Sequence, residues 1–321
     1  MKKANALCLA LVTIGCLSFG SAQASLIEFQ QYNGNVGFSS DGFGSASQSG
    51  TISASVPAGS TVLAAYLYTS TYGNLASAGG SFNASTVSYT GLGSPSGLGG
   101  MEAGRVDVTS LVKPIIDVGA GGVYNFSVRE TSITQDGEAL LVVYSNPALG
   151  VSTVRILNGF SRFAGDTTTI IFTDPLKPAT PGFLAEMALG FGFSAGIPSR
   201  SQASTVSVNG TIVTRNAGNY DDGAFALGAL ITVGGYDDPY SPSNPSYAAD
   251  HERYNLASYL HDGDTTLRID TLNPSADDNL FLAILKVSQA APSEVPEPGS
   301  MALVVLALTG LGRMRRKIRS A

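Results

Sequence analysis

Short runs of alternating or continuous apolar residues cover the chain from Ser25 to Ser288. Clear examples are TVLAAYLYTST, VYNFSVRET, EALLVVYS, STVSVNGTIVT and TTLRIDTL, and clusters of Gly, Pro, Asn and Asp separate them. Such runs predict β-strands joined by turns. Helical periodicity is scarce, since only VDVTSLVKPIIDV and NLASYL accommodate a helical turn. Many strands without intervening helices favour an antiparallel sandwich or jelly roll over an α/β fold, so we predict an all-β body.

The strand-like runs recur in the same order in the two halves of the body. STVSYTG (85–91) resembles STVSVNG (204–210), and around this pair LAAYLYTSTYG matches AEMALGFGFSAG, VDVTSLV matches YNLASYL, VYNFSVRETS matches TTLRIDTLNP, and DGEALLVVY matches DNLFLAILK. Chance similarity among Ser-, Thr- and Val-rich strands is the alternative explanation. With the Pro-rich segment PLKPATP as the join, we predict two related antiparallel β-sandwich, jelly-roll-like lobes, 25–178 and 179–288.

The second half carries an insertion. Ser85 and Val106 are 21 positions apart, whereas Ser204 and Tyr254 are 50 apart. The extra segment includes GGYDDPYSPSNPSYAADHERY, and long irregular excursions on a rigid sandwich are common binding sites. Its oxygen ligands suit calcium and its tyrosines suit stacking on sugar rings, although the spacing fits no EF-hand and an ordered turn-rich loop is the simplest alternative. The residues of this possible ligand loop are Tyr236, Asp237, Asp238, Tyr240, Tyr247 and Asp250.

The charge distribution bears on the partners of the body. The chain has 18 basic and 24 acidic residues, and charged residues make up 13% of it. Without the basic residues of the two ends and the acidic Glu294 and Glu297, 11 basic and 22 acidic residues remain, a net charge of −11. Neutralising nucleic-acid phosphates requires clustered Lys and Arg, so we predict no nucleic-acid partner.

The first 24 residues are typical of an export signal. MKK supplies a positive start, ALCLALVTIGCLSF an apolar stretch, and AQA a small-residue cleavage site at Ala22 and Ala24. Cys8 and Cys16 both lie in this segment. A lipoprotein signal is the alternative, but Thr13 stands where such a signal has Leu before the modified Cys16. Cleavage before Ser25 therefore predicts a mature protein without cysteine, and so without disulfides or a catalytic thiol.

The C-terminal end, VPEPGSMALVVLALTGLGRMRRKIRS, has three parts. After a flexible linker, 289–298, which ends in Pro-Glu-Pro, comes a short apolar run and then a basic end. An apolar helix of about 14 residues spans about 21 Å, short of the ~30 Å hydrocarbon core, but basic side chains at its end extend the effective span. We predict a membrane helix and basic tail over 299–321, against the alternative of an ordinary C-terminal helix. The basic residues that stop the segment at the membrane are Arg313, Arg315, Arg316, Lys317 and Arg319.

This layout resembles the PEP-CTERM sorting tail of exported proteins in Gram-negative bacteria, over roughly the last 27 residues. The resemblance implies that an exosortase, a membrane transpeptidase-like cysteine protease, recognises the motif, and that the tail holds the protein transiently in the inner membrane. It also implies an association with exopolysaccharide and with biofilm or floc formation. The residues that match the processing motif are Val295, Pro296, Glu297 and Pro298. The body resembles repeated β-sandwich modules of microbial surface proteins without assigned activity, and that resemblance lends no site.

One segment matches an enzyme motif. GFSAG (192–196) is a G-x-S-x-G centred on Ser194, but Ile197 and Pro198 follow it where a hydrolase opens a helix. Two histidines, His251 and His261, stand ten positions apart with no thiol available in the body, so no zinc set is evident. We predict no catalytic residues, no metal and no cofactor.

Together these observations predict an exported, non-enzymatic surface or extracellular-matrix protein. Its processing partner would be an exosortase, and its body would have a structural or binding role beside exopolysaccharide. The alternatives are a secreted carbohydrate-binding module and a secreted hydrolase that uses Ser194.

Overall fold

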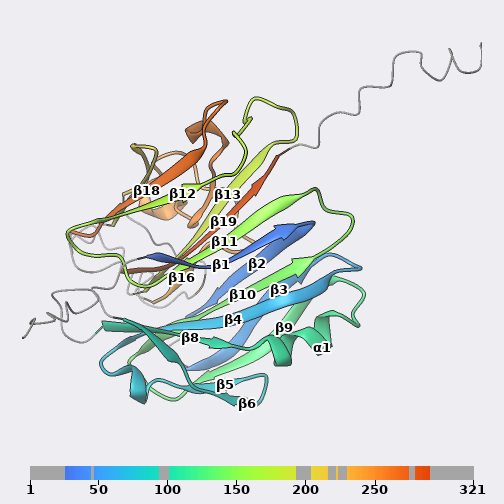
Figure 1. The fold of residues 1–321 in the computed structure, drawn as a ribbon. Helices are drawn as coiled ribbons and strands as arrows, with labels where there is room; N and C mark the ends of the chain where they lie inside the picture. Colours follow the sequence, from blue (N-terminus) through green and yellow to red (C-terminus); the bar gives the residue numbers. More distant parts are fainter. Residues whose placement is uncertain are drawn as a thin grey trace, which may run out of the picture.

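A computed structural model gives the structure of the protein and describes residues 26–44, 47–93, 101–192, 204–215, 222, 230–274 and 279–289. Nearly all regular structure in these residues is β-strand, which confirms the predicted all-β class (Figure 1). The helical elements there are short: α1 (Thr109–Ile116) and the 3-10 turns η1 (Leu75–Ser77), η3 (Tyr247–Ala249) and η4 (Ala257–Tyr259).

The strands of the described residues form four antiparallel sheets, which we number in the order in which they stack in Figure 1. Sheet 1 has the order β3-β9-β5-β6, with bounds Ser49–Val56, Gly122–Glu130, Gly80–Phe82 and Ser85–Val87. Sheet 2 has the order β2-β10-β4-β8-β7, with bounds Val36–Phe43, Gln135–Ser145, Thr61–Tyr72, Met101–Asp107 and Thr90–Gly93.

Sheets 3 and 4 use the later strands together with β1. Sheet 3 has the order β1-β11-β19-β13-β16, with β17 also paired to β13, and the bounds are Ile27–Gly34, Ser152–Asn158, Asn279–Ser288, Leu184–Gly192, Thr232–Val233 and Arg253–Asn255. Sheet 4 has the order β12-β18-β14-β15, with bounds Asp166–Ile171, Thr266–Leu272, Thr205–Val208 and Thr211–Thr214.

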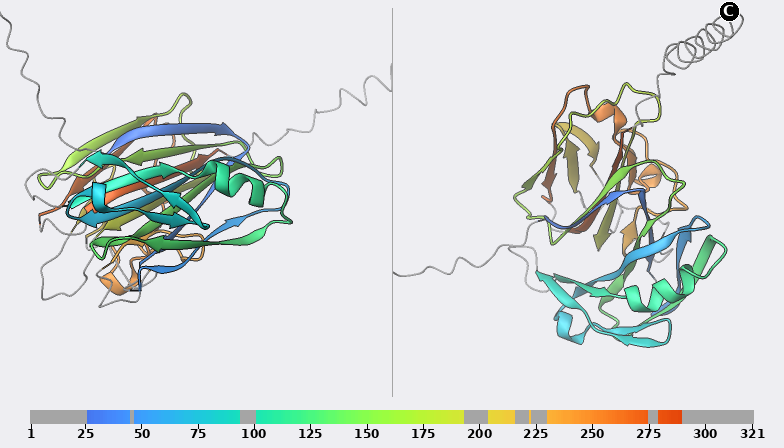
Figure 2. Two further views of the ribbon diagram at one scale, coloured as in Figure 1. Left: turned by 90° about the horizontal axis from the view of Figure 1, so that it is seen from below. Right: turned by 45° about the vertical axis from the view of Figure 1, so that its right-hand side comes forward.

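Three apolar cores hold the four sheets together. One lies between sheets 1 and 2 around Phe126, the next between sheets 2 and 3 around Phe281, and the third between sheets 3 and 4 around Leu285. Figure 1 shows sheet 1 at the bottom and sheet 4 at the top, and the right-hand view of Figure 2 shows the same division into a lower and an upper part. We call sheets 1 and 2 the first sandwich and sheets 3 and 4 the second sandwich.

The central position of sheets 2 and 3 explains their sequences. Both of their faces are covered, so β10 and β19 read as nearly continuous apolar runs, EALLVVY and LFLAIL. In the outer sheets one face meets solvent, and β3 and β9 accordingly alternate between buried and more exposed side chains. The change of pattern along the chain thus reports how many faces of each strand are buried.

Most of the strand order is the same in the two sandwiches. If β2 to β10 are matched in sequence with β11 to β19, then β3-β9-β5-β6 becomes β12-β18-β14-β15, which is the order of sheet 4. Likewise the core of sheet 2, β2-β10-β4, becomes β11-β19-β13 of sheet 3. Strand β1 has no counterpart in this scheme, because it leads from sheet 3 through Asn35 into β2 of sheet 2.

The two sandwiches meet along the chain between β10 and β11, at 146–151. The predicted join at 178 falls instead between β12 and β13, both of which belong to the second sandwich, because β12 pairs with β18. The signal segment 1–24 and the tail 290–321 lie outside the described residues. Within the part that the structure describes, no helix is long and apolar enough to cross a membrane.

Candidate functional site

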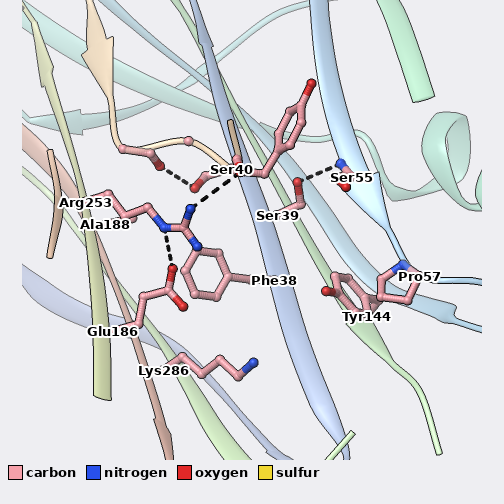
Figure 3. A pocket seen from close by; sticks show the side chains of 13 residues that line it. Phe38, Ser39, Ser40, Ser55, Pro57, Tyr144, Glu186, Ala188, Arg253 and Lys286 are labelled. Carbon is pink, nitrogen blue, oxygen red and sulfur yellow. Dashed lines mark hydrogen bonds and ion pairs between the residues drawn. The ribbon is translucent and has the colours of Figure 1, made fainter. Parts of the chain in front are cut away.

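A pocket of about 250 Å³ opens where the edge strand β2 of the first sandwich faces the second sandwich (Figure 3). Strand β2 contributes Phe38, Ser39 and Ser40, and its neighbours Ser55, Pro57 and Tyr144 complete the side formed by the first sandwich. The second sandwich contributes Glu186, Ala188, Arg253 and Lys286, together with the loop residues Gly234, Gly235 and Tyr236. Both sandwiches are therefore needed to form the walls.

Alternation along β2 distributes its side chains between two neighbours. Ser39 points toward sheet 1, where its Oγ accepts a hydrogen bond from the Ser55 amide at 2.9 Å. Ser40 points toward sheet 3, where its Oγ donates to the Gly234 carbonyl at 2.6 Å. The Ser40 carbonyl accepts from the Tyr236 amide at 3.0 Å, so the loop after β16 is fixed to the edge of β2. Small polar residues on β2 thereby anchor both walls of the pocket.

An ion pair forms the wall on the side of sheet 3. Arg253 Nε lies 2.8 Å from Glu186 Oε1, and Glu186 is only 8% exposed. The same guanidinium donates through Nη1 to the Asp238 carbonyl at 2.8 Å and lies 4.6 Å from the centre of the Tyr240 ring. Arg253 thus holds the loop with a planar fork of donors, the geometry in which arginine is most effective.

Lys286 is the second cation of the pocket. It is directly opposite Glu186 in the β13–β19 register, but Glu186 pairs with Arg253 instead. No hydrogen bond or ion pair links the Lys286 ammonium to the described residues, and Figure 3 draws no dashed line to it. Burial lowers the pKa of Lys286, and the nearby Glu186 carboxylate opposes that shift.

Aromatic rings supply the apolar surface of the pocket. Phe38 and Tyr236 are half-buried, whereas Tyr144 is 7% exposed. Tyr144 pairs across the strands with Gly37, where an added Cβ would lie 2.9 Å from the tyrosine ring. Glycine at this position lets the ring lie against the β2 backbone. Burial and the Glu186 charge raise the pKa of Tyr144, so its hydroxyl stays neutral at neutral pH.

Acidic groups gather just beyond the pocket at its Tyr236 end. Burial raises the pKa of Asp41 to about 7, and the charges of Asp237 and Asp238 add to the shift, while a hydrogen bond from the Ser53 amide opposes it. The positive end of the pocket, at Lys286, is therefore distinct from its acidic end.

The residues of the predicted ligand loop have different surroundings. Tyr236 lines the pocket, Tyr240 stacks with Arg253, and Asp238 Oδ2 accepts from the Gly235 amide at 2.6 Å. Asp237 is exposed, and Tyr247 is half-buried in η3.

Asp250 is fully buried in the same loop. Its carboxylate accepts hydrogen bonds from the hydroxyls of Thr214 and Tyr254. It therefore supports the loop from the interior, whereas Tyr236 reaches the pocket and the ligand role of the remaining loop residues stays a prediction.

The two histidines do not line the pocket. His261 is exposed and 3.8 Å from Asp264, and the His251 amide donates to Ser241 Oγ at 2.8 Å. Ser194, the signal cleavage residues and the Pro-Glu-Pro motif lie outside the described residues. No group of three or more His, Cys, Asp or Glu side chains in the described part of the chain is arranged to hold a metal ion.

Sequence reasoning missed the strand residues of the pocket. Glu186 and Lys286 interrupt the otherwise apolar runs LAEMALGFG and NLFLAILKVS. A charged residue inside a run predicted to be buried requires an ionic partner or a function. The interruption of an apolar run by a charge was therefore the sequence signal that could have identified Glu186 and Lys286.

A second cluster of buried polar groups lies inside the first sandwich. Glu130 and Glu138, 4% and 1% exposed, approach from β9 and β10, and the Tyr89 hydroxyl donates to Glu138 Oε1 at 3.5 Å. Glu130 Oε1 and Glu138 Oε2 have no hydrogen-bond partner among the described residues. Burial raises the pKa of both carboxyl groups, and mutual repulsion with Glu138 raises that of Glu130 further, so this pair holds protons at neutral pH.

Comparisons with known proteins identify no family for this chain. No family model and no curated protein matches it. Among solved structures, it is similar to a β-porphyranase of glycoside hydrolase family 86 from the human gut bacterium Bacteroides plebeius, with 11% identity over 85% of this chain and 38% of that one, at a TM-score of 0.25. The chain thus spans less than half of that enzyme.

Two further solved structures have comparable similarity. The protein PNGF-II is 12% identical over 85% of this chain and 67% of its own, at a TM-score of 0.26. The major capsid protein P2 of Bacteriophage PM2 is 13% identical over 84% of this chain and 99% of its own, at a TM-score of 0.22. Similarity at this level assigns no function to the pocket.

Proposed function

We propose that this chain is an exported, non-enzymatic protein of the cell surface or extracellular matrix whose body binds carbohydrate. The observation that carries the binding role is the pocket between the sandwiches, where the rings of Phe38 and Tyr236 stand beside the serines of β2 and the charges of sheet 3. A few polar groups converging on an apolar concave surface are the common form of a small-molecule site. Ring faces beside hydrogen-bonding groups suit a sugar, which has apolar C–H faces and a rim of hydroxyls.

The charges of the pocket favour binding over hydrolysis. Glycoside hydrolysis uses two carboxyl groups about 5 to 9.5 Å apart. Glu186 is the one carboxylate among the described lining residues, and its Oε1 is engaged by Arg253. We therefore assign no catalytic role to this pocket.

We also infer that the two sandwiches are related jelly-roll-like lobes that arose by duplication. The shared strand order supports this, since β2–β6 and β8–β10 pair in the same pattern as β11–β15 and β17–β19. Duplication gives two central sheets whose free faces are both apolar, and packing these faces together creates the junction in which the pocket lies.

Sorting is proposed from the sequence of the two ends. The export signal and the Pro-Glu-Pro tail predict passage through the inner membrane, transient anchoring, and release by an exosortase to the cell surface or the exopolysaccharide layer. Replacing Glu297 by Ala should leave an unprocessed, cell-associated form with a larger mass, detected by mass spectrometry of cell and medium fractions. Unchanged mass and location would contradict the sorting proposal.

The carbohydrate role is tested by retention on purified exopolysaccharide from the producing cells. Tyr236→Ala, in the pocket, should reduce retention of the secreted protein at least fivefold. Tyr72→Ala is the matched control, because Tyr72 is 59% exposed on β4 and lies outside the pocket. Equal retention of the two variants would remove the pocket from the binding surface.

A further inference from the structure

We infer that the pocket selects a carboxylate-bearing sugar, a hexuronate unit, and binds its carboxylate through Lys286. This inference rests on the proposed carbohydrate role and adds the chemical class of the ligand. It comes from the one cation of the pocket that the described residues leave without an ionic partner.

The position of Lys286 is costly for the folded protein. A partly buried ammonium loses hydration, and this loss is normally offset by a hydrogen bond or an ion pair. Glu186, the nearest candidate by strand register, is held 2.8 Å from Arg253 instead. A ligand carboxylate would supply the missing partner, since a charge-assisted hydrogen bond is among the strongest polar contacts that a pocket can offer.

The charges around the pocket determine the sign of the ligand. Glu186 and Arg253 cancel each other, so Lys286 leaves the lining with a net charge of about +1 within a body of net charge −11. The acidic groups Asp41, Asp237 and Asp238 stand at the opposite, Tyr236 end. An anion is therefore favoured at Lys286 and disfavoured at the other end, which fixes the direction in which an acidic sugar enters.

The size and surface of the pocket favour a single sugar ring. Its 250 Å³ is below the roughly 300–1,000 Å³ of sites for drug-sized ligands. Phe38 offers a ring face in the centre of the pocket, with Lys286 drawn below it in Figure 3. Ser39 and Ser55 lie beyond Phe38 on the side of the first sandwich, where sugar hydroxyls would find polar partners.

Isothermal titration of the secreted full-length mature protein at neutral pH and low salt tests the inference, with D-glucuronate, D-glucose and acetate as probes. D-glucuronate should bind at least tenfold more tightly than D-glucose, because the charge-assisted contact is made only by the acid. Acetate, which lacks the ring, should bind at least tenfold more weakly than D-glucuronate.

Variants assign the preference to Lys286. Lys286→Gln should bind D-glucuronate no better than D-glucose and should melt at the same or a higher temperature, because it removes a cation that lacks a partner. Lys177→Gln makes the same charge change at an exposed position outside the pocket and should behave like the wild type. Should Lys286→Gln fail to fold, Lys286→Arg, which keeps the charge, must retain the preference for the acid.

The outcomes separate this inference from the proposed function. Equal affinity for D-glucuronate and D-glucose overturns the acidic-sugar inference and leaves the carbohydrate role standing. Equal affinity for acetate and D-glucuronate overturns it in favour of a simple anion site. If the wild-type protein binds neither sugar and is not retained on exopolysaccharide, both the acidic-sugar inference and the proposed carbohydrate role are overturned.

Discussion

Arg105 on β8 and Arg253 on β17 lie on corresponding strands of the two sandwiches and have different surroundings. Each lies four residues before a helical turn, α1 in the first sandwich and η4 in the second. The Arg105 guanidinium lies 3.4 Å from the centre of the Phe29 ring, whereas that of Arg253 pairs with Glu186 and holds a loop carbonyl. The same strand framework thus places one arginine on an aromatic ring and the other in a polar pocket.

The strand residues and loops around the two arginines also differ. In the first sandwich, Val143 lies two residues before the end of β10 and pairs with Ala64. At the matching position of the second sandwich, Lys286 lies two residues before the end of β19 and pairs with Glu186. The connection between the strands also differs, with seven residues between β7 and β8 against 19 between β16 and β17. Two charged strand residues and a longer loop therefore distinguish the pocket from the corresponding part of the first sandwich.

Removing the two arginines should give the largest contrast. Arg253→Met leaves Glu186 without its ionic partner in a buried position, so we expect the free energy of unfolding to fall by about 3 kcal/mol. Arg105→Met removes mainly a cation–π contact, and we expect about 1 kcal/mol. Urea denaturation of both variants measures the difference. Equal losses would mean that the ion pair of the second sandwich contributes no more than the ring contact of the first.

The pH dependence of stability distinguishes the buried charges of the two sandwiches. Folding raises the pKa of Glu130 from 4.5 to about 9 and that of Glu138 from 4.5 to about 8, so the folded state binds more protons between these limits. The stability that these groups contribute is present below pH 4.5 and is lost as the pH rises toward 9, by on the order of 1.4 kcal/mol per pH unit for each proton. Lys286, whose pKa is lowered, acts with the opposite sign at higher pH.

Glu138→Gln tests this assignment. The variant keeps the shape of the side chain but not its titration, so denaturation at pH 5 to 9 should show about half the wild-type slope and greater stability at pH 8. The exposed Asp174→Asn serves as the control and should leave the slope unchanged. A wild-type slope in Glu138→Gln would show that the carboxyl pair is not its source.

Equivalent hairpin turns give the smallest expected effect. The β5–β6 turn has Asn83 and Ala84 at φ of 46° and 64°, and the β14–β15 turn has Asn209 and Gly210 at φ of 50° and 80°. A residue with a Cβ is strained in this left-handed region. Ala84→Gly should therefore stabilise the protein by about 1 kcal/mol and Gly210→Ala destabilise it by a similar amount, measured by thermal unfolding. Changes of the same sign in both variants would contradict the equivalence of the turns.

Much of the fold was predictable because burial leaves a direct mark on strand sequences. The β4 and β13 runs and the β10 and β19 runs hold corresponding places in sheets 2 and 3, and all four are buried on two faces. The match of STVSYTG with STVSVNG was off by one strand, because the first covers β6 and the second β14, whose counterpart is β5. The similar Ser, Thr and Val residues of these two segments hid the corresponding places of the two turns, Asn83-Ala84 and Asn209-Gly210.

The site was less predictable for a physical reason. The inserted loop was identified from its length, and it supplies Tyr236. Phe38, Glu186 and Lys286 come from three separate strands, and only the packing of sheet 2 on sheet 3 brings them together. No local sequence pattern predicts which residues of distant strands will come into contact. A charged residue within an apolar strand does mark Glu186 and Lys286 as unusual.

A crystal structure of the secreted protein soaked with D-glucuronate tests the central claim most directly, namely that the junction of the two sandwiches is the binding site. We predict electron density for one sugar ring against Phe38, with a carboxylate oxygen about 2.8 Å from Lys286 Nζ. Density for the sugar on the outer face of either sandwich, with the pocket at Lys286 unchanged, would contradict the account.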